Sequence, residues 1–84
     1  GAYALIRPQD ITLSTAQPIS TSALNILPGT IVDSLEQGSV VMLTVDTGLL
    51  FKVVVTPQSF RELHLSDQKT VFLSFKASAV KIYQ

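Results

Sequence analysis

Apolar residues recur at every second position over much of the chain, which is the period of a half-buried β-strand. In residues 40–45, Val41, Leu43 and Val45 fall on one face, and Met42 and Thr44 fall on the other. In residues 70–75, Val71, Leu73 and Phe75 share one face. Each of these segments therefore predicts a strand that buries one face in a core and turns the other face outward.

Turn signals separate the predicted strands at intervals of roughly 8–12 residues, a spacing typical of small all-β folds. Gly38 and Gly48 are each available for a positive φ, and they predict two successive hairpins. The three strands joined by these hairpins are expected over residues 25–35, 40–45 and 49–55. Pro28 and Gly29 predict a bend or bulge in or beside the first of them.

One short helix is predicted after this three-stranded meander. Thr56 is a suitable N-cap, Pro57 fits the first helical position, and Phe60 and Leu63 follow at helical spacing. Shorter apolar segments predict further strand pieces at residues 3–6, 11–13 and 80–83. The polar stretch over residues 14–22 is typical of a connecting loop. Five or six short strands and one helix favour a small barrel or a sandwich.

The composition narrows the classes of protein. The 84 residues are 46% hydrophobic and 14% charged, with no cysteine and with six basic residues against six acidic ones. This excludes a disulfide scaffold, a thiolate zinc site and a disordered chain. Zero net charge argues against a nucleic-acid partner. Because so short a chain forms only a small core, its high apolar content predicts that a partner or a second copy covers part of its surface.

Neither a membrane span nor a signal peptide is predicted. The longest apolar stretches are far shorter than the ~20 residues that a spanning helix needs. The first residues lack the basic region and the long apolar region of a signal peptide. The chain is therefore expected to be soluble and cytoplasmic, without direct insertion into a membrane.

No set of residues shows the spacing of a catalytic centre. His64 is the only histidine, and without cysteine or a second histidine no metal site is expected. The acidic residues fall mostly in predicted turns or on the helix surface, where turn chemistry accounts for them. Gly38 and Gly48 stand alone and form no phosphate-binding loop. We therefore expect no catalytic residue, no metal and no cofactor, and we do not expect an enzyme.

Lys76 is the residue that points to a ligand. It follows a strand that ends in Phe75 and has apolar segments on both sides, so its ammonium group either extends to water or meets an anion. Ser22, Thr56 and Ser78 could supply hydroxyl donors, and the start of the predicted helix offers free backbone N–H groups. From spacing alone, an anion site and a solvated lysine in a polar turn both stay open.

Four segments carry a resemblance to a known family. They are SALN at residues 22–25, GTIV at 29–32, TPQSF at 56–60 and KASAV at 76–80. In this order and at this spacing they resemble the molybdate-binding-protein (Mop, or TOBE) domain, over about residues 22–83. Separately, LIRPQDITLS at residues 5–14 resembles the segment that joins an ABC transporter ATPase domain to its C-terminal regulatory domain.

The resemblance implies an all-β fold, a small five-stranded oligonucleotide-binding-like (OB-like) barrel with one short helix. Residues 1–21 are then a linker and strand segment that joins to an ATPase domain, and residues 22–84 are the oxyanion-binding domain. The resemblance also implies a homodimer formed through barrel strands, with molybdate or tungstate bound at domain interfaces. The parent ABC ATPase domain and its transmembrane subunits are the other expected partners, which places the domain in the cytoplasm at the inner face of the cell membrane.

The family's motif residues can be carried over one by one. The expected oxyanion-binding residues are Ser22, Asn25, Thr56, Lys76, Ala77 and Ser78. The last three match a Lys-Ala-Ser motif that supplies a charge, a backbone N–H and a hydroxyl. The chain departs from the family at Leu24, which replaces an arginine. Because a hydrogen bond to a charged group contributes roughly 1.5–3 kcal/mol, this departure predicts weaker binding.

The implied function is that of a C-terminal regulatory domain in the ATP-binding subunit of an ABC importer, where bound molybdate or tungstate regulates anion import. The alternative is a ligand-free dimerisation or regulatory module in an importer for another solute, such as a sugar or ferric ion. The Lys-Ala-Ser match at residues 76–78 favours the first reading, and Leu24 favours the second.

Overall fold

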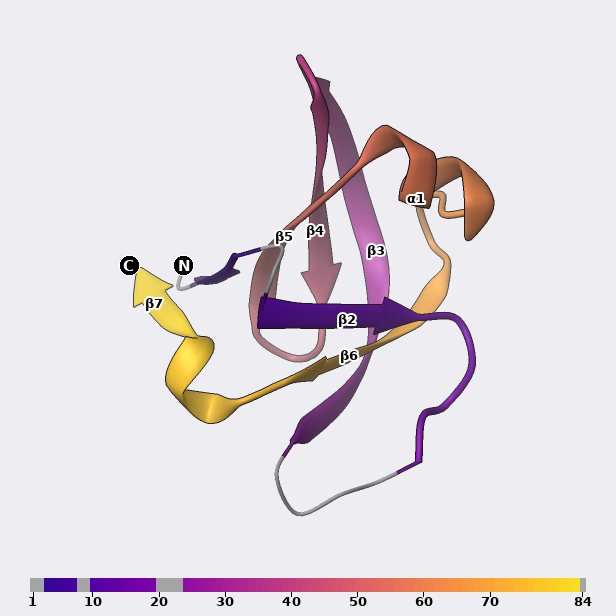
Figure 1. Cartoon of the computed structure of the whole chain (residues 1–84). Helices are drawn as coiled ribbons and strands as arrows, with labels where there is room; N and C mark the ends of the chain where they lie inside the picture. The colour runs from indigo at the N-terminus through magenta and orange to yellow at the C-terminus, as the bar shows by residue number, and fades with distance from the viewer. Residues whose placement is uncertain (1–2, 8–9, 20–23, 84) are drawn as a thin grey trace.

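The computed structural model describes residues 3–7, 10–19 and 24–83, which form one strongly curled β-sheet and a short α-helix (Figure 1). In chain order the elements are β1 (Tyr3–Ile6), β2 (Ile11–Ser14), β3 (Asn25–Gln37), β4 (Val40–Asp46), β5 (Leu50–Val55), α1 (Pro57–Glu62), β6 (Thr70–Phe75), the 3-10 turn η2 (Ala77–Ala79) and β7 (Lys81–Tyr83). Among these elements, no helix has the length and apolar character needed to cross a membrane.

In the described residues, the sheet contains seven strands in the order β2-β6-β3-β4-β5-β1-β7. Every neighbouring pair is antiparallel except β1 with β5, which is parallel. The expected all-β, OB-like architecture with one short helix is confirmed, but the expected number of five strands differs from the seven found in the described residues. The difference arises because the short segments predicted at residues 3–6, 11–13 and 80–83 all pair with the sheet, and Ile6 of β1 is completely buried in the core.

The long strand β3 gives the sheet its curl. Residues 25–30 pair with β6, residues 30–37 pair with β4, and the register shifts between Ile31 and Asp33. The predicted irregularity therefore lies a few residues beyond Pro28 and Gly29, which stay in register with β6. A bulge bends the strand and increases its local twist, so a single strand can belong to both halves of the sheet.

The core is formed by the alternating residues that the sequence pattern assigns to one face of each strand. Both predicted buried faces are confirmed, since Val71, Leu73 and Phe75 of β6 and their counterparts on β4 are at most 4% exposed. The buried hydrophobic residues are Ile6, Ile31, Val41, Leu43, Val45, Phe51, Val53, Leu65, Val71, Leu73 and Phe75. Phe60 and Leu63, from α1 and its C-terminal end, pack against this cluster and cover one side of it.

The two hairpin turns have the predicted glycine chemistry. Gly38 has a φ of 62° and Gly48 a φ of 102°, values that favour glycine over other residues. The second turn is held by its own side chains, because the Gly48 N–H donates to the Asp46 carboxylate at 2.9 Å and the Thr47 hydroxyl donates to the Leu49 carbonyl at 2.9 Å. The predicted meander of β3, β4 and β5 is therefore confirmed.

Gly29 allows β3 to pass close to β4. A methyl group at this position would lie 2.7 Å from Val45 Cγ1 and 2.8 Å from Thr47 Cγ2, and Val45 is fully buried. Real side chains do not approach so closely, so an added Cβ would force core residues to move. A glycine is therefore needed at position 29, where β3 passes close to β4.

We predict that Gly29→Ala destabilises the chain by about 1–3 kcal/mol, the usual cost of overpacking a well-packed core. Urea unfolding measures this as a lower denaturation midpoint. Ser39→Ala, in the exposed turn between β3 and β4, is the control and is expected to leave the midpoint unchanged. A Gly29→Ala midpoint equal to that of the parent chain would show that the close approach of β3 to β4 does not require glycine at this position.

Candidate functional site

Lys76 and η2 form a small polar corner where β6 ends. The backbone of Lys76 is extended, with φ −82° and ψ 143°, and the chain then turns through Ala77, Ser78 and Ala79. The Ala79 N–H donates to the Lys76 carbonyl at 3.0 Å and so closes the turn. Because Lys76, Ala77 and Ser78 are all exposed, the corner presents a charge and a hydroxyl to solvent.

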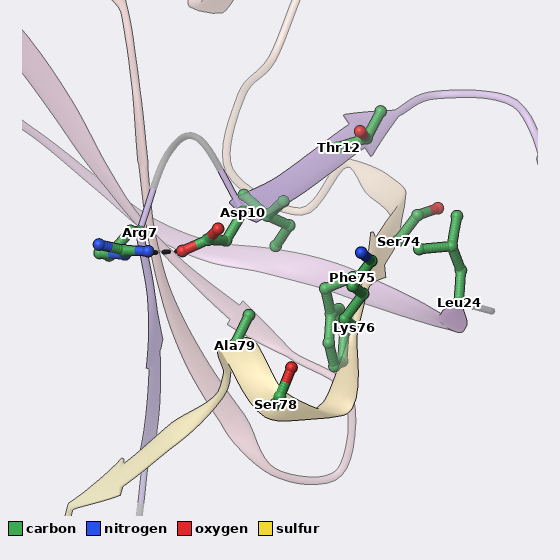
Figure 2. A pocket seen from close by; sticks show the side chains of 10 residues that line it. Arg7, Asp10, Thr12, Leu24, Ser74, Phe75, Lys76, Ser78 and Ala79 are labelled. Carbon is green, nitrogen blue, oxygen red and sulfur yellow. Dashed lines mark hydrogen bonds and ion pairs between the residues drawn. The ribbon is translucent and has the colours of Figure 1, made fainter.

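This corner is one wall of a cleft of about 390 Å³ (Figure 2). The volume falls within the roughly 300–1,000 Å³ of small-ligand sites. The cleft is lined by Arg7, Asp10, Ile11, Thr12, Leu24, Ser74, Phe75, Lys76, Ser78 and Ala79. In the view of Figure 2, Arg7 and Asp10 lie at one end, Leu24 lies at the other, and Lys76 and Ser78 lie between them.

The charged groups give the cleft a net positive character. Arg7 Nε donates to Asp10 Oδ2 at 2.7 Å, in a pair whose side chains are 70% and 25% exposed. Lys76 makes no ion pair with any residue in the part of the chain that the structure describes. Two cations against one carboxylate leave one positive charge uncompensated at the cleft, which favours an anion.

The donor chemistry of the cleft also fits an anion better than a cation. Its polar side chains are one ammonium group, one guanidinium group, three hydroxyls and a single carboxylate that already accepts from Arg7. Within residues 3–7, 10–19 and 24–83, no group of three histidine, cysteine, aspartate or glutamate residues lies together as a metal site would require.

Most of the sequence-predicted site residues gather at this corner. Lys76 and Ser78 line the cleft, and Ala77 lies between them in η2. Asn25 pairs in register with Phe75, so it lies one strand away from Lys76 with its side chain exposed. Ser22 lies outside the described residues.

Thr56 is the predicted site residue that the structure places elsewhere. It lines a second cleft of about 280 Å³, together with Val54, Ser59 and Leu63. The two clefts share only Ile11 and Thr12 of β2, so this strand lies between them. Within one copy of the chain, Thr56 is therefore not brought together with Lys76.

The Thr56 hydroxyl already has a structural task. It accepts from the Ser59 N–H at 3.1 Å and contacts Ser59 Oγ at 3.0 Å, which confirms the predicted N-cap of α1. Pro57 stands at the start of the helix, as expected. A residue that caps a helix contributes to stability whether or not it also meets a ligand.

Sequence reasoning missed four polar residues of the cleft, namely Arg7, Asp10, Thr12 and Ser74. The first three come from a segment that is expected to be a linker with short strand pieces. The pairing of β1 with β7 and of β2 with β6 brings them to Lys76. Ser74 left no distinct signal in the sequence, because a polar residue is expected on the outward face of this strand. Its burial is apparent only in the structure.

A strongly curled, mostly antiparallel sheet with one short helix defines a small OB-like barrel domain. The family model of the TOBE domain matches residues 21–82, and the chain belongs to this family.

Two curated relatives are ATP-binding proteins. The chain is 37% identical to the molybdate/tungstate import ATP-binding protein WtpC of Pyrococcus abyssi and 33% identical to the protein of the same name from Pyrococcus horikoshii, each over 79 residues. Each match covers 93% of this chain and 23% of the relative. The chain thus spans about a quarter of the length of these relatives.

One solved structure is similar over nearly the whole chain. It is a crystal structure of the cytoplasmic molybdate-binding protein ModG with molybdate bound, which matches at a TM-score of 0.73 and 26% identity. The match covers 94% of this chain and 58% of that chain. This likeness agrees with the curled sheet described above.

We predict that Thr56→Ala lowers the free energy of unfolding by about 0.5–2 kcal/mol, because the Ser59 N–H loses its capping acceptor. Thr56→Ser keeps the hydroxyl and is expected to retain most of that stability. Urea unfolding of the two variants against the parent chain makes the comparison. Equal midpoints for Thr56→Ala and the parent chain would contradict a capping role.

Proposed function

We propose that this chain is an oxyanion-binding regulatory domain of an ABC importer, and that its ligand is molybdate or tungstate. The cleft beside Lys76 is the observation that carries the proposal. It combines an ammonium group that makes no ion pair with any described residue, a set of hydroxyls and a net positive charge in a volume suited to a small ligand. The names of the curated relatives and of the similar solved structure support the choice of ligand.

The corner at Lys76 offers three kinds of contact to a tetrahedral dianion. The ammonium group supplies a charge-assisted hydrogen bond, and the Ser78 hydroxyl supplies a second donor. In the described part of the chain, the N–H groups of Ala77 and Ser78 donate to no backbone carbonyl, as is usual at the start of a 3-10 turn. These groups are aligned by the turn itself, so little ordering is needed when an anion binds.

A second copy of the chain would bring Thr56 to the site. In one copy Thr56 and Lys76 lie in separate clefts on either side of β2, which is an edge strand of the sheet. Pairing of two barrels at this edge would set the Thr56 cleft of one copy against the Lys76 cleft of the other. Among the exposed apolar side chains, Leu24 lines the Lys76 cleft beside β2 and is available to such an interface.

The parent protein is proposed to carry the ATPase. The curated relatives are ATP-binding proteins of import systems, and this chain corresponds to about a quarter of their length. The domain itself would then be non-catalytic. The expected linker over residues 1–21 would be attached to it through β1 and β2, which are strands of the same sheet. The domain would be located on the cytoplasmic side of the membrane, beside the transmembrane subunits of the importer.

A second candidate function is a ligand-free regulatory or dimerisation module in an importer for another solute. Leu24 is the observation that favours it, because this apolar residue lines the cleft at the position where the family motif has an arginine. The two functions differ in one measurable respect, since only the first requires saturable binding of an oxyanion.

We predict that Lys76→Gln weakens molybdate binding by about 10- to 100-fold, the equivalent of one charged hydrogen bond. Isothermal titration of the 84-residue chain with sodium molybdate, with sulfate as the comparison anion, measures the change. Lys69→Gln is the matched control, because it removes the same charge at the opposite end of β6, about 20 Å away. Equal losses in both variants would reveal a general charge effect and would contradict a site at Lys76.

We predict that Asp10→Asn strengthens molybdate binding by up to about fivefold. The substitution removes a negative charge from the cleft and releases Arg7, and a partly exposed ion pair of this kind contributes about 0.2–1 kcal/mol. The gain should shrink at high salt, where such interactions are screened. Asp33→Asn, at an exposed position on β3, is the control. Unchanged or weaker binding by Asp10→Asn would contradict the proposed charge balance.

A further inference from the structure

Ser74 is a buried polar residue with no partner. Its side chain is 7% exposed, and its hydroxyl oxygen is fully buried without a hydrogen bond to any described residue. It is the only buried side-chain atom of this kind in the described residues. A buried polar group left unpaired costs roughly 1–3 kcal/mol, so this position weakens the fold unless something else satisfies the hydroxyl.

The strand geometry places Ser74 beside Lys76. Successive side chains of a strand alternate, and because the backbone of Lys76 continues β6 in an extended conformation, Ser74 and Lys76 share one face. Their Cα atoms are about 7 Å apart by the rise of a strand. Both residues line the same cleft.

Thr12 adds a second hydroxyl on this face. It is the register partner of Ser74 in the pairing of β2 with β6, and it also lines the cleft. Directly paired residues have Cβ atoms about 4.5–5.5 Å apart, which allows both hydroxyls to reach neighbouring oxygens of one anion. Figure 2 shows Thr12 and Ser74 on the side of the cleft away from Ser78.

Two features of Ser74 point to a ligand rather than to packing. A serine in a central strand packs less well than the apolar residues around it, and its hydroxyl adds a desolvation cost. Rotation of χ1 among its staggered positions can turn the hydroxyl toward the cleft. An oxyanion beside Lys76 would then supply the acceptor that the folded chain lacks.

We infer that the hydroxyls of Ser74 and Thr12 bind the oxyanion together with Lys76, as contacts that the Lys-Ala-Ser motif does not include. This inference rests on the proposed function of the cleft. It adds two hydroxyl donors, from β2 and β6, to the site. These donors partly compensate for the missing arginine of the family motif, whose position is occupied by Leu24. It also assigns the N-terminal segment to the ligand site, since Thr12 comes from β2.

The test combines binding with stability in the 84-residue chain. Ser74→Ala is expected to weaken sodium molybdate binding about tenfold or more in isothermal titration, as for the loss of a hydrogen bond to a charged group. The same variant is expected to unfold in urea at an equal or higher midpoint, because the orphaned hydroxyl is gone. A purely structural hydroxyl would give the opposite pattern of lower stability and unchanged binding.

Thr12→Val and the double variant Ser74→Ala/Thr12→Val complete the experiment. Valine keeps the shape of threonine at an exposed position, so folding is not at risk, and the double variant is expected to bind more weakly than either single one. Ser39→Ala, in the exposed turn, is the control for loss of a serine hydroxyl. Parent-like affinity of the double variant, in a chain where Lys76→Gln loses binding, would overturn the inference and leave the proposed function standing. No saturable molybdate binding by the parent chain would overturn both.

Discussion

The structure depends on the bend in β3. This strand pairs with β6 over its first half and with β4 over its second half, and the register shift between Ile31 and Asp33 separates the two. The bend wraps the sheet around Ile31, which is fully buried, and so closes a core that a flat sheet of this size could not enclose. Because β6 pairs with the first half of β3, the same bend determines where Lys76 and the cleft lie. Stability and function therefore share one geometric constraint.

The cleft is formed by chain segments that are distant in sequence. Arg7, Asp10 and Thr12 come from the N-terminal part, Leu24 from the start of β3, and the remaining lining residues from β6 and η2. The pairing of β2 with β6 joins the N-terminal part to the cleft, and the pairing of β3 with β6 brings the start of β3 to it. An anion held there would be bonded to both the N-terminal segment and the barrel. Such a ligand favours the arrangement in which both are in place, which is a simple physical route from binding to regulation.

Much of the fold could be predicted because local chemistry agrees with the final structure. Alternating apolar residues on β4 and β6, glycines with positive φ in both hairpins and the Thr56 cap each act within a few residues. The number of strands was harder to predict, because the segments at residues 3–6 and 11–13 are too short to indicate which strands they pair with. The site was half predictable. Lys76 and Ser78 could be proposed from the spacing of the sequence and from the Lys-Ala-Ser motif, whereas Ser74 and Thr12 join the proposed site only through the register of two strands.

Crystallisation of the 84-residue chain with sodium tungstate is the most direct test of the central claim, since the heavy atom locates itself by its anomalous signal. The account predicts one strong peak per cleft, with ligand oxygens within hydrogen-bond distance of Lys76 Nζ and the Ser78 hydroxyl. An anomalous peak on another surface of the protein would contradict the proposed site. So would the absence of a peak beside Lys76 in crystals grown with saturating tungstate.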